Sequence, residues 1–251
     1  MIKIILVIGI SIALGIICGS GCVYAFNHIP DEWLGADEEG RDWQRVKSVP
    51  WKYIFTATFI VAGIYIGLSD FEKAAGVYAS CLLLCEIGMA AFLYDRIPRP
   101  LVWLLALTGV GILPFTIAED LGFGPGMTGM LKAHLLGAAV GFFVMLLLVV
   151  LKSFVTVSGL KNRPGAFNVC ELALVLGLLC GWRRVLTIIA CGLIAWGVYV
   201  VFKKYRKGGI MSQRMSADGT LQKIGLSENF FITASAFVWM LAGAGLDITI
   251  I

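Results

Sequence analysis

Long apolar runs, separated by short charged segments, constrain this chain more than any other feature of its sequence. Of its 251 residues, 59% are hydrophobic and only 14% are charged. A typical soluble domain carries about 25% charged residues. Runs of roughly 17 to 25 apolar residues are typical of membrane helices, because lipid offers no hydrogen-bond partner to an exposed backbone. We therefore predict an all-α membrane protein.

The apolar runs predict a bundle of about eight transmembrane helices, in a single polytopic domain that covers residues 1–251. The connecting segments 27–49 and 203–227 are expected to be cytoplasmic loops. The predicted spans are Ile4–Phe26, Ile54–Leu68, Ala74–Tyr94, Leu101–Ile117, Leu131–Leu151, Val169–Trp182, Leu186–Phe202 and Phe230–Leu246.

The distribution of lysine and arginine predicts the orientation of these spans. With the N-terminus outside, the segments assigned to the cytoplasm contain fifteen basic residues and the outside segments contain five. Basic residues are retained on the cytoplasmic side of a membrane, so we expect both termini to lie outside. The basic segment 203–207 is expected to face anionic lipid. No nucleic-acid partner is predicted.

The seven cysteines all lie in or at the edge of apolar runs, where cysteine behaves as a small hydrophobic residue. The loop 27–49 contains no cysteine, and no histidine accompanies the two cysteine pairs that are spaced four residues apart. We therefore predict no metal site and no cofactor.

A turn between two apolar runs resembles a family signature. It extends from Ala91 to Pro98 and ends in Arg96-Ile97-Pro98. Earlier in the chain, Gly19-Ser20 is followed after nine residues by Pro30. Together these segments resemble the opening pattern and the Asp-x(5)-Ile/Leu-Pro signature of type IV prepilin peptidases, the membrane aspartyl proteases that trim the leader sequences of pilins. The resemblance implies that Ala91 stands at the position of the first catalytic aspartate.

The second signature of that family is Gly-x-Gly-Asp-x-Lys-Leu, followed by a Leu-Gly-x(3)-Gly helix. The segment from Leu176-Gly177 to Gly181 resembles the helix. Counting back from it places Val169 at the second catalytic position and Glu171 at the lysine position, whereas a register shifted by one residue places Asn168 at the catalytic position. Neither register supplies a carboxylate, and an aspartyl protease needs two carboxylates that share one proton.

Three acidic side chains remain as candidates for chemistry. Asp95 and Glu171 lie near the two vacated positions, on the same predicted side of the membrane, where they could form a displaced pair. Alternatively, both are interfacial polar residues. Glu86 lies deep within an apolar run, where an ionisable residue is a functional candidate by default. Its alternative role is a protonated side chain that is hydrogen-bonded to a neighbouring helix.

The resemblance implies a prepilin-peptidase-like bundle in a bacterial or archaeal inner membrane, holding the helix of a single-span, pilin-like partner. Because Ala91 and Val169 or Asn168 replace the catalytic aspartates, we expect a pseudoenzyme. An active aspartic endopeptidase that cleaves the leader peptides of type IV pilin-like precursors is the alternative hypothesis. A small transporter or lipid-modifying enzyme on an unrelated eight-helix fold is a third.

Overall fold

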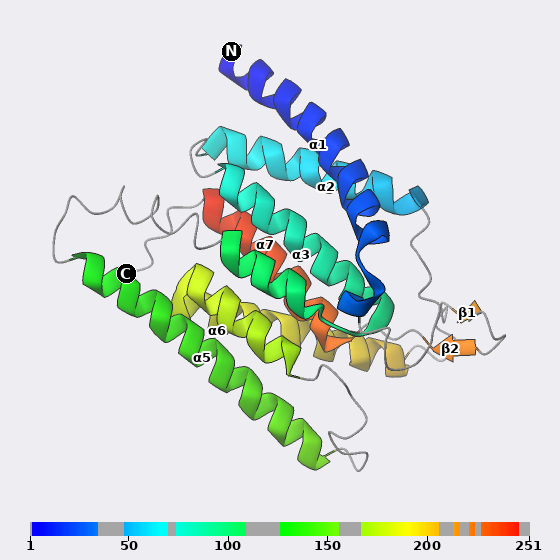
Figure 1. The fold of residues 1–251 in the computed structure, drawn as a ribbon, viewed down its shortest axis with the longest axis vertical. Coiled ribbons are helices and arrows are strands. Elements are labelled where there is room, and N and C mark those ends of the chain that lie inside the picture. Colours follow the sequence, from blue (N-terminus) through cyan, green and yellow to red (C-terminus); the bar gives the residue numbers. More distant parts are fainter. Residues whose placement is uncertain are drawn as a thin grey trace.

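A computed structural model describes residues 2–34, 48–69, 74–108, 126–155, 167–205, 213–215, 221–223 and 227–245. In these ranges the chain is almost entirely helical (Figure 1). The elements are α1 (Ile2–His28), the short 3-10 helix η1 (Asp31–Leu34), α2 (Ser48–Ser69), α3 (Ala74–Tyr94), a short helix Arg99–Thr108, α5 (Gly126–Val155), α6 (Asn168–Tyr205), β1 (Gln213–Met215), β2 (Leu221–Lys223) and α7 (Glu228–Gly245). Strands β1 and β2 form an antiparallel pair within the predicted loop 203–227.

Five helical segments are long and apolar enough to cross a membrane, which is compatible with a membrane protein. They are Ile4–His28, Pro50–Leu68, Val77–Tyr94, Lys132–Phe154 and Asn168–Phe202. The prediction of eight separate spans is met only in part. The apolar helices Arg99–Thr108 and Glu228–Leu241 are shorter, and two predicted spans fall within α6. Residues 109–117 of the fourth predicted span, and most of the two predicted loops, lie outside the described residues.

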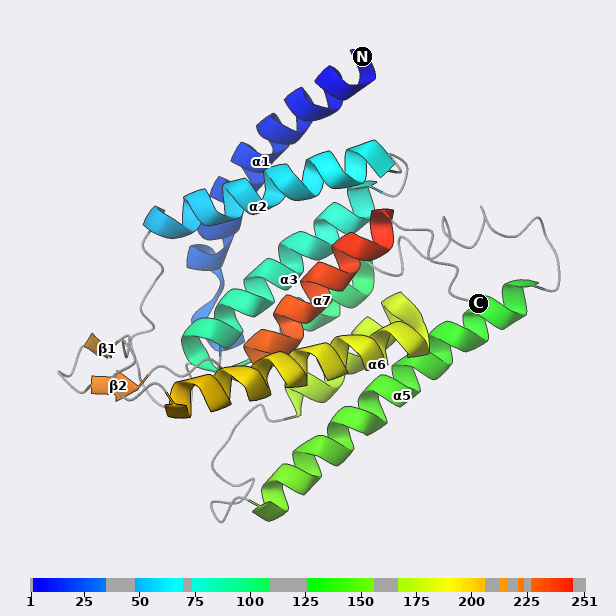
Figure 2. The same ribbon diagram turned by 180° about the vertical axis from the view of Figure 1, so that it is seen from behind.

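Helix α6 reverses direction at Gly181, where φ is 79° and ψ is 170°. A positive φ of this size is readily available only to glycine, because a side chain would clash with the backbone. Ala173 precedes the bend and Val185 follows it, yet both lie against Gly141 of α5. The two arms therefore form a hairpin (Figure 2). The predicted boundary between the sixth and seventh spans falls at this bend.

Glycines hold α5 and α6 together at very short range. A Cβ atom added to Gly137 would overlap the carbonyl oxygen of Gly177, and one added to Gly177 would overlap the carbonyl group of Gly137. The Nδ1 atom of His134 lies 2.7 Å from the carbonyl oxygen of Leu178 along the same seam. Small residues permit such an approach of membrane helices. The space that these glycines create is therefore occupied by the chain's own helices.

Helices α1 and α2 form a second close pair. A Cβ atom at Gly15 would overlap Ile60, and one at Gly19 would overlap Thr56. In the other direction, a Cβ atom at Gly63 would lie 3.1 Å from the side chain of Ser11. Glycines of both helices therefore allow their backbones to approach closely where they cross.

Helices α3 and α7 lie between these two pairs (Figures 1 and 2). The core of the bundle is built from fully buried aliphatic side chains of α3, α6, α7 and the helix 99–108. Its members include Leu84, Ile87, Leu105, Leu172, Ile188 and Ile232. This central position brings the C-terminal end of α3 next to the starts of α6 and α7.

Candidate functional site

The two segments that resemble family signatures are in direct contact. The side-chain amide of Asn168, at the start of α6, donates a hydrogen bond to the carbonyl oxygen of Ile97 at 2.7 Å. Next to it, Arg99 pairs with Glu171 through two contacts, Nε to Oε2 at 3.0 Å and Nη2 to Oε1 at 2.9 Å. Such a bidentate salt bridge fixes the relative orientation of the two side chains as well as their distance. The structure thus brings together segments that are about 70 residues apart in the chain.

The two positions that the resemblance assigns to catalytic aspartates, Ala91 and Val169, are buried and apolar. Ala91 is 1% exposed and Val169 is 6% exposed, and both lie among core side chains. The carbonyl oxygen of Ala91 accepts hydrogen bonds from the backbone nitrogen of Asp95 at 3.1 Å and from the hydroxyl of Ser227 at 3.4 Å. Neither Ala91 nor Val169 has a group that can exchange a proton, so these positions cannot perform acid–base chemistry.

The proposed displaced pair of Asp95 and Glu171 is not formed by any hydrogen bond within the described part of the chain. Asp95 is exposed and has a φ of 56°, a left-handed conformation that aspartate tolerates better than most residues. Both carboxylate oxygens of Glu171 contact Arg99 instead. Two carboxylates that share a proton must be in direct contact. The observed arrangement is therefore that of a salt bridge beside an exposed aspartate.

Glu86 lies elsewhere on α3. It precedes Ala91 by five residues, so the two side chains leave the helix at directions roughly 140° apart. Its side chain is 7% exposed. Within the described ranges, no hydrogen bond or ion pair joins Glu86 to another residue. Glu86 is thus a buried acid that is separate from the two signature segments.

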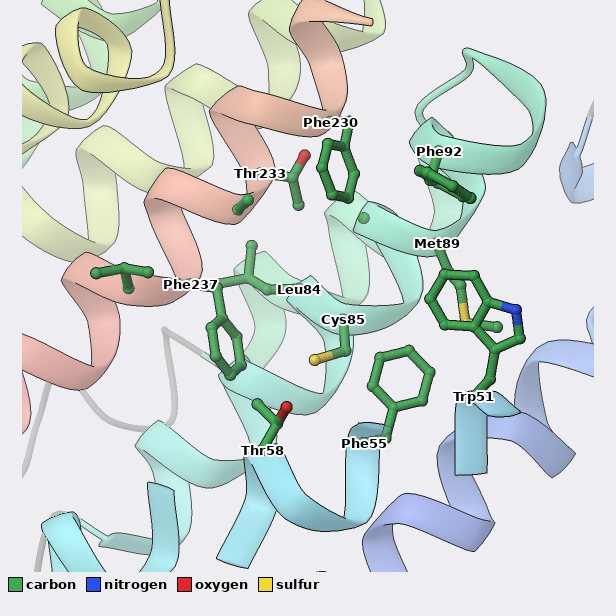
Figure 3. A pocket seen from close by; sticks show the side chains of 13 residues that line it. Trp51, Phe55, Thr58, Leu84, Cys85, Met89, Phe92, Phe230, Thr233 and Phe237 are labelled. Atoms are coloured by element: carbon green, nitrogen blue, oxygen red, sulfur yellow. The ribbon is translucent and has the colours of Figure 1, made fainter. Parts of the chain in front are cut away.

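A cavity of about 210 Å³ lies between α2, α3 and α7, beside the end of α3 (Figure 3). Aromatic rings close the end nearest the signature segments. The rings of Trp51 and Phe92 meet edge to face at 5.5 Å between centroids, and those of Phe92 and Phe230 lie 5.4 Å apart. The lining also includes Cys85, Thr58 and Phe237. The cavity is therefore an apolar space whose lining includes Phe92, the residue that follows Ala91.

Sequence reasoning missed this cavity, although its walls leave a pattern. Trp51, Phe55 and Thr58 are spaced four and then three residues apart, and so are Phe230, Ala234 and Phe237. This spacing places each set on one face of its helix. The pattern does not indicate that the two faces meet across α3.

The described residues contain neither a cluster of metal ligands nor a disulfide bond. There, no cluster of three or more histidine, cysteine, aspartate or glutamate side chains could hold a metal ion. All seven cysteines are free thiols.

Comparison with protein-family models, curated proteins and solved structures finds no match to this chain. The relation to prepilin peptidases consequently stands on the signature-like segments, and we carry it forward as a proposal.

Proposed function

We propose that this chain is a prepilin-peptidase-like protein without peptidase chemistry, which binds the transmembrane helix of a single-span, pilin-like partner. In this proposal it is a multi-pass protein of a bacterial or archaeal cytoplasmic membrane, with its N-terminus outside. The helices cross the membrane about eight times, with the two arms of α6 counted separately.

One observation supports the proposal. The contacts that join the two signature-like segments are present, whereas the two aspartates that a peptidase would need there are absent. Asn168 and the Arg99–Glu171 pair hold these segments side by side. Ala91 and Val169 fill the vacated positions with buried apolar side chains. An enzyme that had lost only its chemistry would keep such a scaffold for the binding function that remains.

The glycine seam between α5 and α6 does not provide the partner site, because Gly137 and Gly177 already contact each other. The partner helix instead meets the bundle at the end where α3 finishes and α7 begins. Tyr94 is half-buried there, and Asp95 and Ser227 leave polar groups at the same end. A surface of this kind suits the junction between an apolar helix and its polar flank.

The test is photocrosslinking in membranes that contain candidate pilin-like proteins. A photoreactive residue at position 94 should capture one small single-span protein, whereas the same residue at Leu107, which is 68% exposed at the far end of helix 99–108, should not. Ala91→Asp should leave the capture unchanged, because binding does not use the vacated position for chemistry. Equal capture at both positions, or none at position 94, would contradict the proposed function.

A further inference from the structure

The side-chain hydroxyls that line the cavity between α2, α3 and α7 are already hydrogen-bonded, and the indole N–H of Trp51 is the main polar group that remains in the lining. The hydroxyl of Thr58 donates to the carbonyl oxygen of Ile54 at 2.8 Å, and that of Thr233 donates to the carbonyl oxygen of Asn229 at 2.8 Å. Both threonines are therefore satisfied within their own helices. A buried water needs two to four polar partners, so water is a poor occupant of this space.

The cavity is also too large to remain empty without cost. Engineered apolar cavities of roughly 150 Å³ already take up benzene from solution, and this one measures about 210 Å³. Its lining atoms lose their dispersion contacts unless an apolar occupant supplies them. An apolar ligand is thus the occupant that the lining chemistry selects.

The shape of the cavity narrows the choice of ligand. The lining residues extend from Trp51 to Thr58 along α2 and from Phe230 to Val238 along α7. At a rise of 1.5 Å per residue, these stretches are about 10 to 12 Å long. An elongated apolar space of this length suits an extended hydrocarbon chain better than a compact ligand.

The surrounding bilayer can supply such a hydrocarbon chain. Val238, which lines the cavity, is 61% exposed, and Thr58 on the α2 wall is half-buried. The α2 wall belongs to a segment of membrane-spanning length, whose outward face carries the exposed Val61. A cavity that opens sideways on such a face is continuous with the hydrocarbon of the bilayer. The aromatic rings of Trp51, Phe92 and Phe230 close its other end.

We propose that this cavity binds one acyl chain of a membrane phospholipid, which enters laterally between α2 and α7. Its lining does not include Tyr94, Asp95 or Ser227, which mark the proposed partner site. The bound chain would make a specific lipid part of the folded bundle, in contrast to the lipid that merely surrounds it.

The test uses the purified full chain in nanodiscs of phosphatidylglycerol that carries a photoreactive group on its acyl chain. Crosslinked lipid should map to Val238 and Phe237 well above its level at Val61, which is similarly exposed on the outer face of α2. Equal labelling of Val238 and Val61 would mean that only surrounding lipid is present, and would overturn the proposal.

Two cavity-filling variants sharpen this test from opposite walls. Gly88→Leu on α3 and Ala234→Leu on α7 should each abolish labelling at Phe237 while leaving Val61 labelled. Gly88→Ala is the matched control, because a Cβ atom there meets only the methyl group of Thr233 at an ordinary 3.6 Å. Labelling that persists in a folded filling variant would overturn the proposal. So would a photoreactive residue at position 238 that captures a polypeptide instead of lipid in native membranes.

Discussion

Asn168 and Ile97 are joined by a hydrogen bond of 2.7 Å between elements that the chain separates by 71 residues. The donor is the side-chain amide of a residue that one register of the signature places at a catalytic position. A carboxylate there could only accept hydrogen bonds. The contact therefore requires the amide, which joins the start of α6 to the turn that contains Ile97.

Replacing Asn168 should measure that attachment. Asn168→Ala leaves the carbonyl of Ile97 without this donor and should lower the free energy of unfolding by about 1 kcal/mol. Asn168→Asp also sets a carboxylate against that carbonyl and should cost about 2 to 3 kcal/mol. Thermal unfolding in detergent compares the two variants. An Asn168→Asp protein that is as stable as the wild type would show that the amide is not needed as a donor.

The purified protein should not cleave pilin-type leader peptides, because neither vacated position carries an ionisable group. Loss of one general acid or base typically lowers a rate by about 10²- to 10⁴-fold, and here both are missing. Ala91→Asp alone should also be inactive, because the second acid is still absent. Mass spectrometry of a panel of precursors provides the measurement. Cleavage by the wild type that disappears in Asp95→Asn or Glu171→Gln would reveal a displaced catalytic pair.

The close contact between α5 and α6 predicts different effects of alanine at two glycines of α6. Gly177→Ala forces a Cβ atom into the backbone of Gly137 and should cost about 3 kcal/mol or more of stability. Gly197→Ala is the matched control, because a Cβ atom there has no neighbouring atom within 4 Å. It should be neutral, or stabilise the helix by up to about 1 kcal/mol. Equal melting temperatures would argue against the glycine seam as the main contact between these helices.

Membrane orientation can be tested with cysteines introduced into the predicted loops. Cysteines introduced between 203 and 223, in a variant without native cysteines, should react with an impermeant thiol reagent only in inside-out vesicles. The reason is that this segment carries six of the chain's basic residues. A cysteine at Lys73, which the charge pattern places outside, serves as the opposite control. Labelling of the 203–223 cysteines in right-side-out vesicles would reverse the proposed orientation.

Local patterns were sufficient to predict several helices, but not their partners. The predicted span Ala74–Tyr94 has the same bounds as α3, because the apolar run ends at Asp95 and a proline follows at position 98. The spacing of Gly137 from Gly141 indicated a packing surface. It did not indicate that this surface meets α6, because a glycine pair offers the same close approach to any helix.

The candidate site was predictable in its parts and not as a whole. The sequence placed Asp95 and Glu171 on one side of the membrane, but it contained no sign that Arg99 would engage Glu171. Glu86, which the sequence places deep within an apolar run, is 7% exposed in the structure. The cavity depends on three helices that are distant in the chain, and its volume follows from how their faces meet. That geometry is a property of the packed bundle, and no single segment encodes it.

The hairpin at Gly181 determines on which side of a membrane the chain continues after α6. An uninterrupted apolar helix from Asn168 to Phe202 would cross a bilayer once and exchange sides. With the reversal, the chain after Tyr205 returns to the side on which α6 begins, whether its arms cross fully or turn back at mid-depth. In the proposed topology, the signature segments and the basic stretch 203–207 therefore face the same compartment. Any soluble factor that reaches one of them has access to the other.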